Sequence, residues 1–186
     1  NLVAKQDYIS SPDGDSILMW GFANGAAGTM QYPGPTLIIQ QGQVITVNLT
    51  NELPAVHGQN VSIVFPGQLV DTSTSDPGDV DGALTKEAPD GTTVVTYQFT
   101  ATHAGTFMYK SGTRPDLQVE MGLVGAIVVR PTIPAGWPTS DPREFTDAIH
   151  YAYEHLDTAY NHEYLYLVTE IDVKIQDDVR GRDVFV

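Results

Sequence analysis

Alternating apolar and polar positions predict β-strands in the first two-thirds of the chain. In residues 44–50 apolar side chains alternate with threonine and asparagine, and residues 95–100 repeat the same period of two. This period is typical of strands with one buried and one solvated face. We expect a core between two facing sheets, lined by Ile45, Val47, Leu49, Val95, Tyr97, Phe99, Phe107, Ile127 and Val129.

Short apolar runs bounded by turn residues predict the remaining strands. Residues 2–9 and 16–22 flank a dense turn signal of serine, proline, aspartate and glycine, which predicts a hairpin. Further runs of this kind are residues 36–39, beginning after Pro35, and residues 61–65, 105–109 and 122–129. About nine strands without a long helix predict an all-β fold, a β-sandwich with Greek-key connections.

The last third of the chain predicts a C-terminal extension of linker, strand and short helix. Proline, threonine and tryptophan recur in residues 131–142, which is typical of a linker. An aromatic-rich run at 160–166 leads into a predicted strand at 167–172 and a helical pattern at 173–179. One strand and one helical turn cannot bury a core of their own. The expected division is a first domain at 1–131, a linker at 132–159, and the start of a second domain or a packing tail at 160–186.

Composition and charge exclude several classes of function. The formal net charge is −14 with a pI near 4.4, so a nucleic-acid backbone or an anionic membrane surface repels the chain. Cysteine is absent, which excludes disulfides, thiolate catalysis and a blue-copper centre within this chain. No apolar run reaches the ~20 residues of a membrane helix. Residues 1–7 lack the pattern of a signal peptide, as expected for a mature or trimmed form.

Histidines, acidic residues and glycosylation sequons are further candidate sites. Of the histidines, His57 and His103 fall in predicted loops. The spacings between His150, His155 and His162 fit neither one face of a helix nor one face of a strand. The acidic stretch at 70–91 contains Asp71, Asp76, Asp79, Asp81, Glu87 and Asp90. We interpret it as a solvated surface loop, with a calcium cage or a cationic partner as alternatives. Sequons begin at Asn48 and Asn60.

Four ordered segments carry a resemblance to a known family. They read Tyr-Pro-Gly-Pro-Thr at 32–36, Ala-Gly-Thr-Phe-Met-Tyr at 104–109 and Met-Gly-Leu-Val-Gly-Ala-Ile-Val-Val at 121–129, with the strand region 42–54 between the first two. Across residues 30–131 the chain resembles the N-terminal cupredoxin domain of bacterial-type multicopper oxidases. The resemblance implies a cupredoxin-like sandwich in an extracytoplasmic protein. Residues 164–172 are similar to the opening strand of the second domain in some bacterial members, which implies a fragment of a larger protein.

The family's copper-ligand positions carry other residues in this chain. The family's His-Trp-His-Gly segment corresponds to Val64-Phe65-Pro66-Gly67, and its His-Ser-His segment corresponds to Lys110-Ser111-Gly112. Val64, Pro66, Lys110 and Gly112 therefore stand where the resemblance places ligands, and none offers an imidazole nitrogen. We expect no catalytic residue, no metal ligand and no cofactor in this chain, although copper is expected in the parent family.

Two interpretations of Lys110 remain open. In the first, the Lys110 ammonium replaces the charge of the missing metal and pairs with Asp116 or Glu120. In the second, Lys110 is an ordinary surface lysine at the end of a strand. Neither interpretation restores oxidase chemistry.

The leading hypothesis is a copper-free structural and interface domain of a multicopper-oxidase-like oxidoreductase. In this hypothesis the redox coppers lie outside the chain, the chain alone is inactive, and its partners are other cupredoxin domains of the same protein or copies of itself. One alternative is a copper-dependent oxidase that oligomerisation or partner domains complete. The other is a binding module that uses the acidic loop 70–91.

Overall fold

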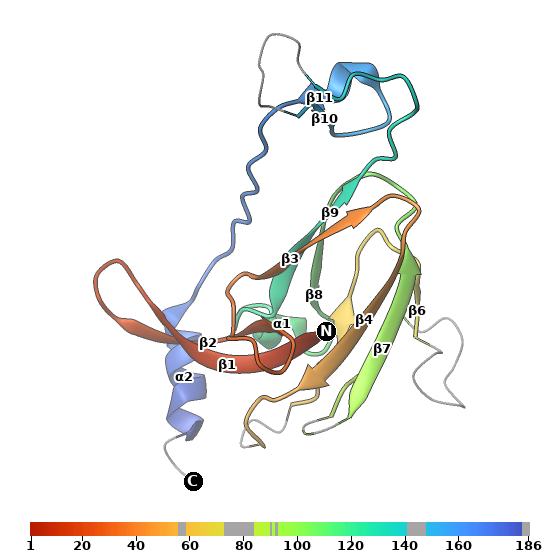
Figure 1. Cartoon of the computed structure of the whole chain (residues 1–186). Helices are drawn as coiled ribbons and strands as arrows, with labels where there is room; N and C mark the ends of the chain where they lie inside the picture. Colours follow the sequence, from red (N-terminus) through yellow and green to blue (C-terminus); the bar gives the residue numbers. More distant parts are fainter. Residues whose placement is uncertain (56–58, 73–83, 90, 92, 141–147, 184–186) are drawn as a thin grey trace.

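Two β-sheets packed face to face make up the main body of the molecule (Figure 1). The computed structural model describes residues 1–186 except 56–58, 73–83, 90, 92, 141–147 and 184–186. The five-stranded sheet has the order β2-β1-β4-β7-β6 and the four-stranded sheet has the order β3-β9-β8-β5. The strands are β1 Leu2–Ser10, β2 Ser16–Asn24, β3 Gly34–Gln40, β4 Val44–Asn51, β5 Ile63–Val64, β6 Val70–Asp71, β7 Val94–Thr100, β8 Gly105–Ser111 and β9 Val124–Arg130. The predicted all-β sandwich is confirmed.

Most strands lie where the hydrophobic pattern predicts them. The hairpin of β1 and β2 pairs antiparallel from Leu2 opposite Asn24 to Ser10 opposite Ser16. The strand predicted to begin after Pro35 begins instead at Gly34. Because β3 is an edge strand, the missing N–H of Pro35 removes no bond from the interior of the sheet.

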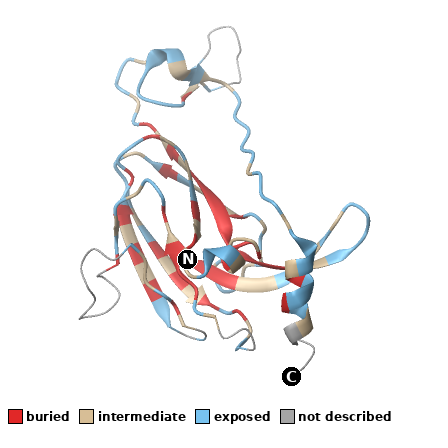
Figure 2. Ribbon diagram, turned by 180° about the vertical axis from the view of Figure 1, so that it is seen from behind, coloured by how far each residue is buried: buried red, intermediate tan, exposed pale blue. Residues whose placement is uncertain are grey.

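The predicted core is confirmed and lies between the two sheets, as the buried inner faces in Figure 2 show. Seven of the nine predicted residues are buried, and Ile45 and Phe107 are half-buried and pack against the cluster. The predicted core did not include the side chains of β2, although Trp20 and Phe22 on this strand are among the largest buried side chains. Because β2 is buried along both faces, its near-continuous apolar sequence shows no alternation.

A close approach between β8 and β9 places a strict limit on side-chain size. The buried Tyr109 ring lies against Gly125, and its hydroxyl donates a 2.7 Å hydrogen bond to the Pro35 carbonyl. Burial raises the pKa of this phenol, so the group stays a neutral donor. A Cβ atom on Gly125 would lie only 2.3 Å from Tyr109 Cζ.

We expect Gly125→Ala to lower the free energy of unfolding by about 1–3 kcal/mol, because the added methyl overpacks the core. The matched control is Gly181→Ala in the C-terminal helix, where no atom lies within 4 Å of the added Cβ. Urea unfolding of both variants checks this prediction. A Gly125→Ala variant as stable as the parent chain would contradict it.

The C-terminal extension contains short elements and one longer helix. These are β10 His150–Tyr151, the 3-10 helix Leu156–Thr158, β11 Ala159–Tyr160 and α2 Val173–Asp183, while the short helix α1 Pro115–Gln118 lies in the main body between β8 and β9. β10 and β11 pair antiparallel, so part of the predicted linker at 132–159 carries secondary structure. The predicted helix at 173–179 is confirmed and extends to Asp183.

The predicted strand at 167–172 is wrong. Among the described residues, none of residues 167–172 belongs to a strand, and the backbone has no regular secondary structure up to the start of α2. A strand needs a neighbouring sheet edge as well as a suitable sequence. The helix α2 then returns to the main body and buries Gln176 and Val179, with Gln176 Nε2 donating to the Glu120 carbonyl at 3.2 Å.

Candidate functional site

The residues predicted to stand at the family's copper-ligand positions lie at the junction of β5 and β8. Val64 and Lys110 are direct antiparallel partners, so their side chains project from the same face of the sheet. Gly112 follows the end of β8, where its N–H donates a 3.3 Å hydrogen bond to the Ser62 carbonyl. Pro66 is exposed just beyond β5. The structure therefore brings Val64, Lys110 and Gly112 together and leaves Pro66 at the margin.

These residues do not fit a copper ion. Val64 and Pro66 have no donor atom in their side chains, Gly112 has no side chain, and an ammonium such as that of Lys110 repels a cation. Space is also short, since a Cβ on Gly112 would lie 2.8 Å from Val64 Cγ1 and 3.0 Å from Ser62 Oγ. Across the described residues, no group of three or more His, Cys, Asp or Glu could hold a metal ion.

Side-chain hydrogen bonds connect the segments around this junction. Ser62 Oγ and Thr113 Oγ1 are 2.9 Å apart, and the Thr113 hydroxyl also lies 2.8 Å from Glu87 Oε1. The second oxygen of Glu87 accepts a 2.9 Å bond from Asn60 Nδ2. The carboxylate thus links the loop that follows β8 to the segment that precedes β5.

A second set of bonds, made by the buried side chains of Ser111 and Gln118, lies beside the first. The Ser111 hydroxyl donates to Gln118 Oε1 at 2.6 Å, and Gln118 Nε2 donates to the Asn60 carbonyl at 2.8 Å. Ser111 and Gln118 have no exposed surface, so each bond satisfies a group whose burial would otherwise be costly. The corner formed by β5, β8 and α1 is held by these bonds.

Neither predicted carboxylate pairs with Lys110. Asp116 forms an exposed ion pair with Arg114 at 3.7 Å. The Glu120 carboxylate accepts a 2.6 Å hydrogen bond from the backbone N–H of Asp172, just before α2. Within the described residues no ion pair or hydrogen bond of the Lys110 side chain is found, and the residue is half-buried. The structure favours the surface-lysine interpretation.

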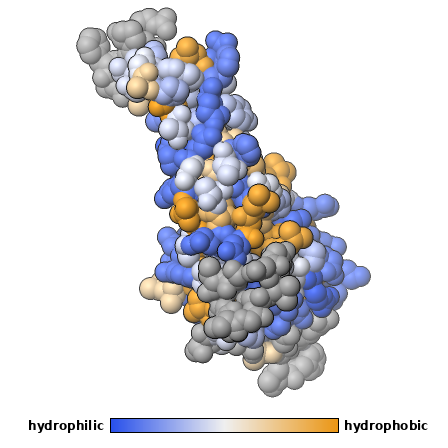
Figure 3. Space-filling view, turned by 90° about the vertical axis from the view of Figure 1, so that its right-hand side faces the viewer, coloured by the Kyte–Doolittle hydropathy of each residue, from blue (hydrophilic) through white to orange (hydrophobic). Residues whose placement is uncertain are grey.

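An apolar groove lies beside the ligand positions, between β5 and β6. Its volume is about 420 Å³, and its lining includes Val64, Pro66, Leu69 and Leu84. Leu69 is 92% exposed and Leu84 is 84% exposed, so both leucines present their side chains to solvent. Figure 3 shows apolar surface on the side of the molecule that carries β6 and β7. Such a surface suits contact with another protein better than metal binding.

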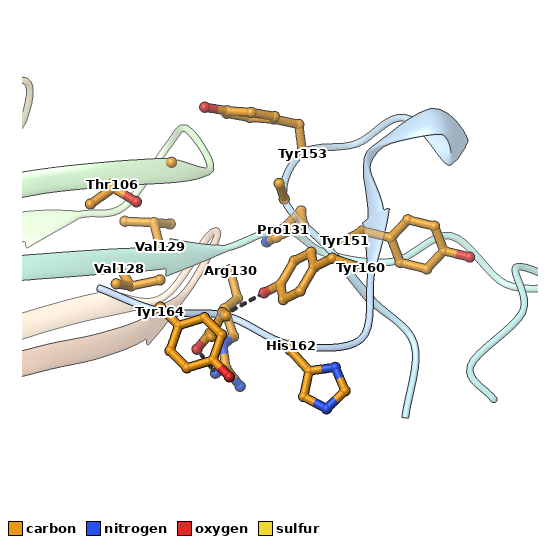
Figure 4. Close-up of a pocket in the computed structure, with 13 residues that line it drawn as sticks. Thr106, Val128, Val129, Arg130, Pro131, Tyr151, Tyr153, Tyr160, His162 and Tyr164 are labelled. Atoms are coloured by element: carbon orange, nitrogen blue, oxygen red, sulfur yellow. Dashed lines mark hydrogen bonds and ion pairs between the residues drawn. The ribbon is translucent and has the colours of Figure 1, made fainter. Parts of the chain in front are cut away.

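A cluster of tyrosines forms a second hollow, where the end of β9 meets the β10–β11 hairpin (Figure 4). The Glu163 carboxylate accepts hydrogen bonds from Tyr160 and from Arg130, each at 2.6 Å. Burial, followed by this bond to Glu163, raises the pKa of Tyr160 to about 12. The bond from Tyr160, followed by that from Arg130, lowers the pKa of Glu163. The carboxylate is fully engaged, so the cluster ties the hairpin to β9 rather than offering a free base.

The predicted histidines are dispersed. His57 lies outside the described residues, and His103 is exposed after β7. The His150 ring lies 5.6 Å from the ring of Tyr160. His155 Nδ1 accepts a 3.3 Å bond from the backbone N–H of Asp157 at the start of the 3-10 helix. His162 lines the tyrosine hollow. The described histidines therefore do not form a shared site.

The acidic loop and the second sequon each contribute to the network at the ligand positions. Glu87 is bonded to Asn60 and to Thr113, Asp71 is exposed on β6, and Asp76, Asp79, Asp81 and Asp90 lie outside the described residues.

The two sequons differ in their surroundings. Asn48 lies within β4, where its amide bonds to Asn1 and Thr96. Asn60 is exposed in the segment before β5 and is bonded to Glu87, whereas Ser62 of the same sequon has no exposed surface.

Sequence reasoning missed the polar network and the Arg130–Glu163–Tyr160 cluster. Ser111, Gln118 and Asn60 come from separate segments, so no local pattern joins them. One signal was available for the second cluster, because Arg130 ends a near-continuous apolar run, and an arginine placed there needs an acidic partner.

Comparisons with known proteins agree with the β-sandwich fold described above. A family model described as multicopper oxidase matches residues 20–133. The chain is 34% identical over 146 residues to laccase-1 of Emericella nidulans, which covers 76% of this chain and 22% of that protein. It is 34% identical over 110 residues to the multicopper oxidase MCE of Talaromyces pinophilus, which covers 59% of this chain and 16% of that protein.

A solved structure of a multi-copper oxidase from Pseudomonas thermotolerans matches with a TM-score of 0.54 and 25% identity, covering 73% of this chain and 30% of that one. The sandwich is thus of the cupredoxin type. The chain spans less than a quarter of the length of the curated relatives that it matches, between 16% and 22%.

Proposed function

This chain belongs to the multicopper oxidase family, and we propose that within it the chain is a copper-free structural and interface domain. The redox coppers of the larger oxidoreductase then lie outside this chain, and the chain alone has no oxidase activity. One observation carries the proposal: Val64 and Lys110 are direct partners where the family's ligands would stand, and neither can bind copper.

The chemistry of the junction supports the absence of a resident metal. Copper prefers imidazole and thiolate donors, and the junction offers an isopropyl group and an ammonium instead. The hydrogen bonds of Ser111, Gln118 and Glu87 hold the same corner with side chains alone. Its stability is therefore expected to be independent of metal.

The interface role rests on the groove and on the length of the relatives. Exposed Leu69 and Leu84 border the ligand positions, and burial of such leucines against a protein surface is favourable. The curated relatives are more than four times as long as the matched segment. We infer that the partners are other cupredoxin domains of the same protein, in the extracytoplasmic location that the family resemblance implies.

Among the described residues, no helix has the length and apolar character needed to cross a membrane.

Copper analysis of the purified chain tests the proposal. After expression in copper-supplemented medium and gel filtration, mass spectrometry is expected to find well below one copper per chain, because the junction lacks imidazole donors. Thermal unfolding is expected to be the same with and without EDTA. Stoichiometric copper that survives dialysis against EDTA would overturn the proposal, as would a melting temperature that falls when EDTA is added.

A further inference from the structure

Lys110 is a half-buried cation at the edge of the apolar groove between β5 and β6. Its direct strand partner Val64 lines that groove, and the Cβ atoms of such partners lie about 5 Å apart. Within the described residues Lys110 has no counter-charge, because Asp116 pairs with Arg114 and Glu120 is bonded to the backbone just before α2. A protein surface that covers the groove therefore also covers an unpaired ammonium.

Covering such an ammonium is costly unless the covering surface supplies a negative charge. An ammonium that leaves water needs a carboxylate or another acceptor, since its desolvation otherwise outweighs the gain from apolar contact. The gain comes from Leu69 and Leu84, which are 92% and 84% exposed at the groove. The groove and Lys110 together select a surface that carries both an apolar side chain and a carboxylate.

A second cation at the same corner is held in an unfavourable backbone conformation. Arg114 has φ 43° and ψ 61°, and among the described residues it is the one non-glycine residue with a positive φ. The left-handed region is unfavourable for a residue with a Cβ atom, so glycine would be more stable there. The ion pair with Asp116 is exposed and 3.7 Å long, so it holds the arginine only weakly. Backbone strain of this kind is typical of side chains with a function.

We propose that the groove, Lys110 and Arg114 form one docking surface for a protein segment in which carboxylates flank an apolar side chain. The inference rests on the proposed interface function and names the chemistry of the partner. Leu69 and Leu84 supply the apolar contact, and an arginine beside such a contact is typical of the residues that dominate binding. The two cations fix the orientation of the partner through complementary charge.

A titration with two short peptides tests the charge preference. The isotope-labelled chain is titrated with acetyl-Leu-Glu-Leu-Glu-amide and, as the matched neutral probe, with acetyl-Leu-Gln-Leu-Gln-amide. We expect the backbone amide signals of Leu69, Leu84 and Lys110 to shift, with a dissociation constant lower by about threefold or more for the acidic peptide. The net charge of −14 repels that peptide at long range, so a preference for it has to come from local cations.

Substitutions show which cations carry the preference. Lys110→Gln is expected to abolish most of the difference between the two peptides, whereas Lys174→Gln, at an exposed lysine on α2, should bind both like the parent chain. Arg114→Gly is expected to reduce the difference and also to raise the urea concentration at the unfolding midpoint, because glycine tolerates the left-handed backbone. A merely structural arginine would give the second effect without the first.

Three results would overturn the proposal: equal affinity for the two peptides, no shift at Leu69 and Leu84, or an equal loss in Lys110→Gln and Lys174→Gln. These outcomes are separate from the copper test. A chain that holds stoichiometric copper contradicts the proposed function, whereas a copper-free chain without the charge preference contradicts this inference alone.

Discussion

Replacement of Phe99 by alanine is expected to lower the free energy of unfolding by about 3–5 kcal/mol, because it leaves a cavity in the centre of the sandwich. Phe99 is 3% exposed on β7, and its ring centroid lies 5.1 Å from that of Phe65. The surroundings cannot easily collapse into the space. The neighbouring Tyr97 hydroxyl accepts a 3.1 Å bond from the N–H of Ile63, which fixes the position of its ring.

Urea unfolding of Phe99→Ala checks this prediction against Thr100→Ala, a substitution at the exposed next residue of the same strand. The control should change stability by less than about 0.5 kcal/mol. A loss below about 1 kcal/mol for Phe99→Ala would contradict the packing described for β7.

The double substitution Val64→His with Lys110→His is expected to create a copper site. These residues are direct antiparallel partners, so two imidazoles would project from one face within about 5 Å of each other at their Cβ atoms. The change also removes a cation and adds donors that suit copper. We expect copper affinity to exceed that of either single variant by about tenfold or more, since two donors then act on one ion.

Oxygen consumption with a phenolic donor is nevertheless expected to stay at the level of free copper. The chain has no cysteine for a blue-copper centre, and Ser62 Oγ, which would lie 3.0 Å from a Cβ on residue 112, obstructs a third imidazole there. Calorimetry of the double and single variants measures the affinity, and an oxygen electrode measures turnover. Equal affinity of the double and single variants would contradict the placement of residues 64 and 110, and sustained turnover would contradict the proposed function.

The strands were predictable where one face of a sheet is buried and the other is solvated. Residues 44–50 and 95–100 alternate because their side chains point in turn to core and solvent, and they became β4 and β7. Motif order also gave the correspondence of Val64 and Lys110 to the family's ligand segments, which stays a prediction. Their direct pairing across β5 and β8 is a matter of register, which no local pattern in two-residue β5 specifies.

The remaining features depend on contacts between distant segments. The run at 167–172 predicted a strand, but a partner strand is a tertiary property. The helix α1 is four residues long, too short to leave a helical period in the sequence. The bond from Gln118 to Asn60 joins residues 58 positions apart. Physical chemistry requires a partner for such a buried amide without saying where along the chain it lies.

The attachment of α2 has a consequence for how the molecule opens. The chain leaves the sandwich after Arg130, is tied near that point by the Glu163 pair, and is tied again where Gln176 meets Glu120. The tie at Glu163 is a small number of polar bonds, whereas α2 also adds Val179 and Ile175 to the apolar cluster that holds the sandwich together. The β10–β11 hairpin and the segment that leads to α2 can therefore open while α2 and both sheets stay packed. The chain thus has two tiers of stability, with residues 150–172 on the lower one.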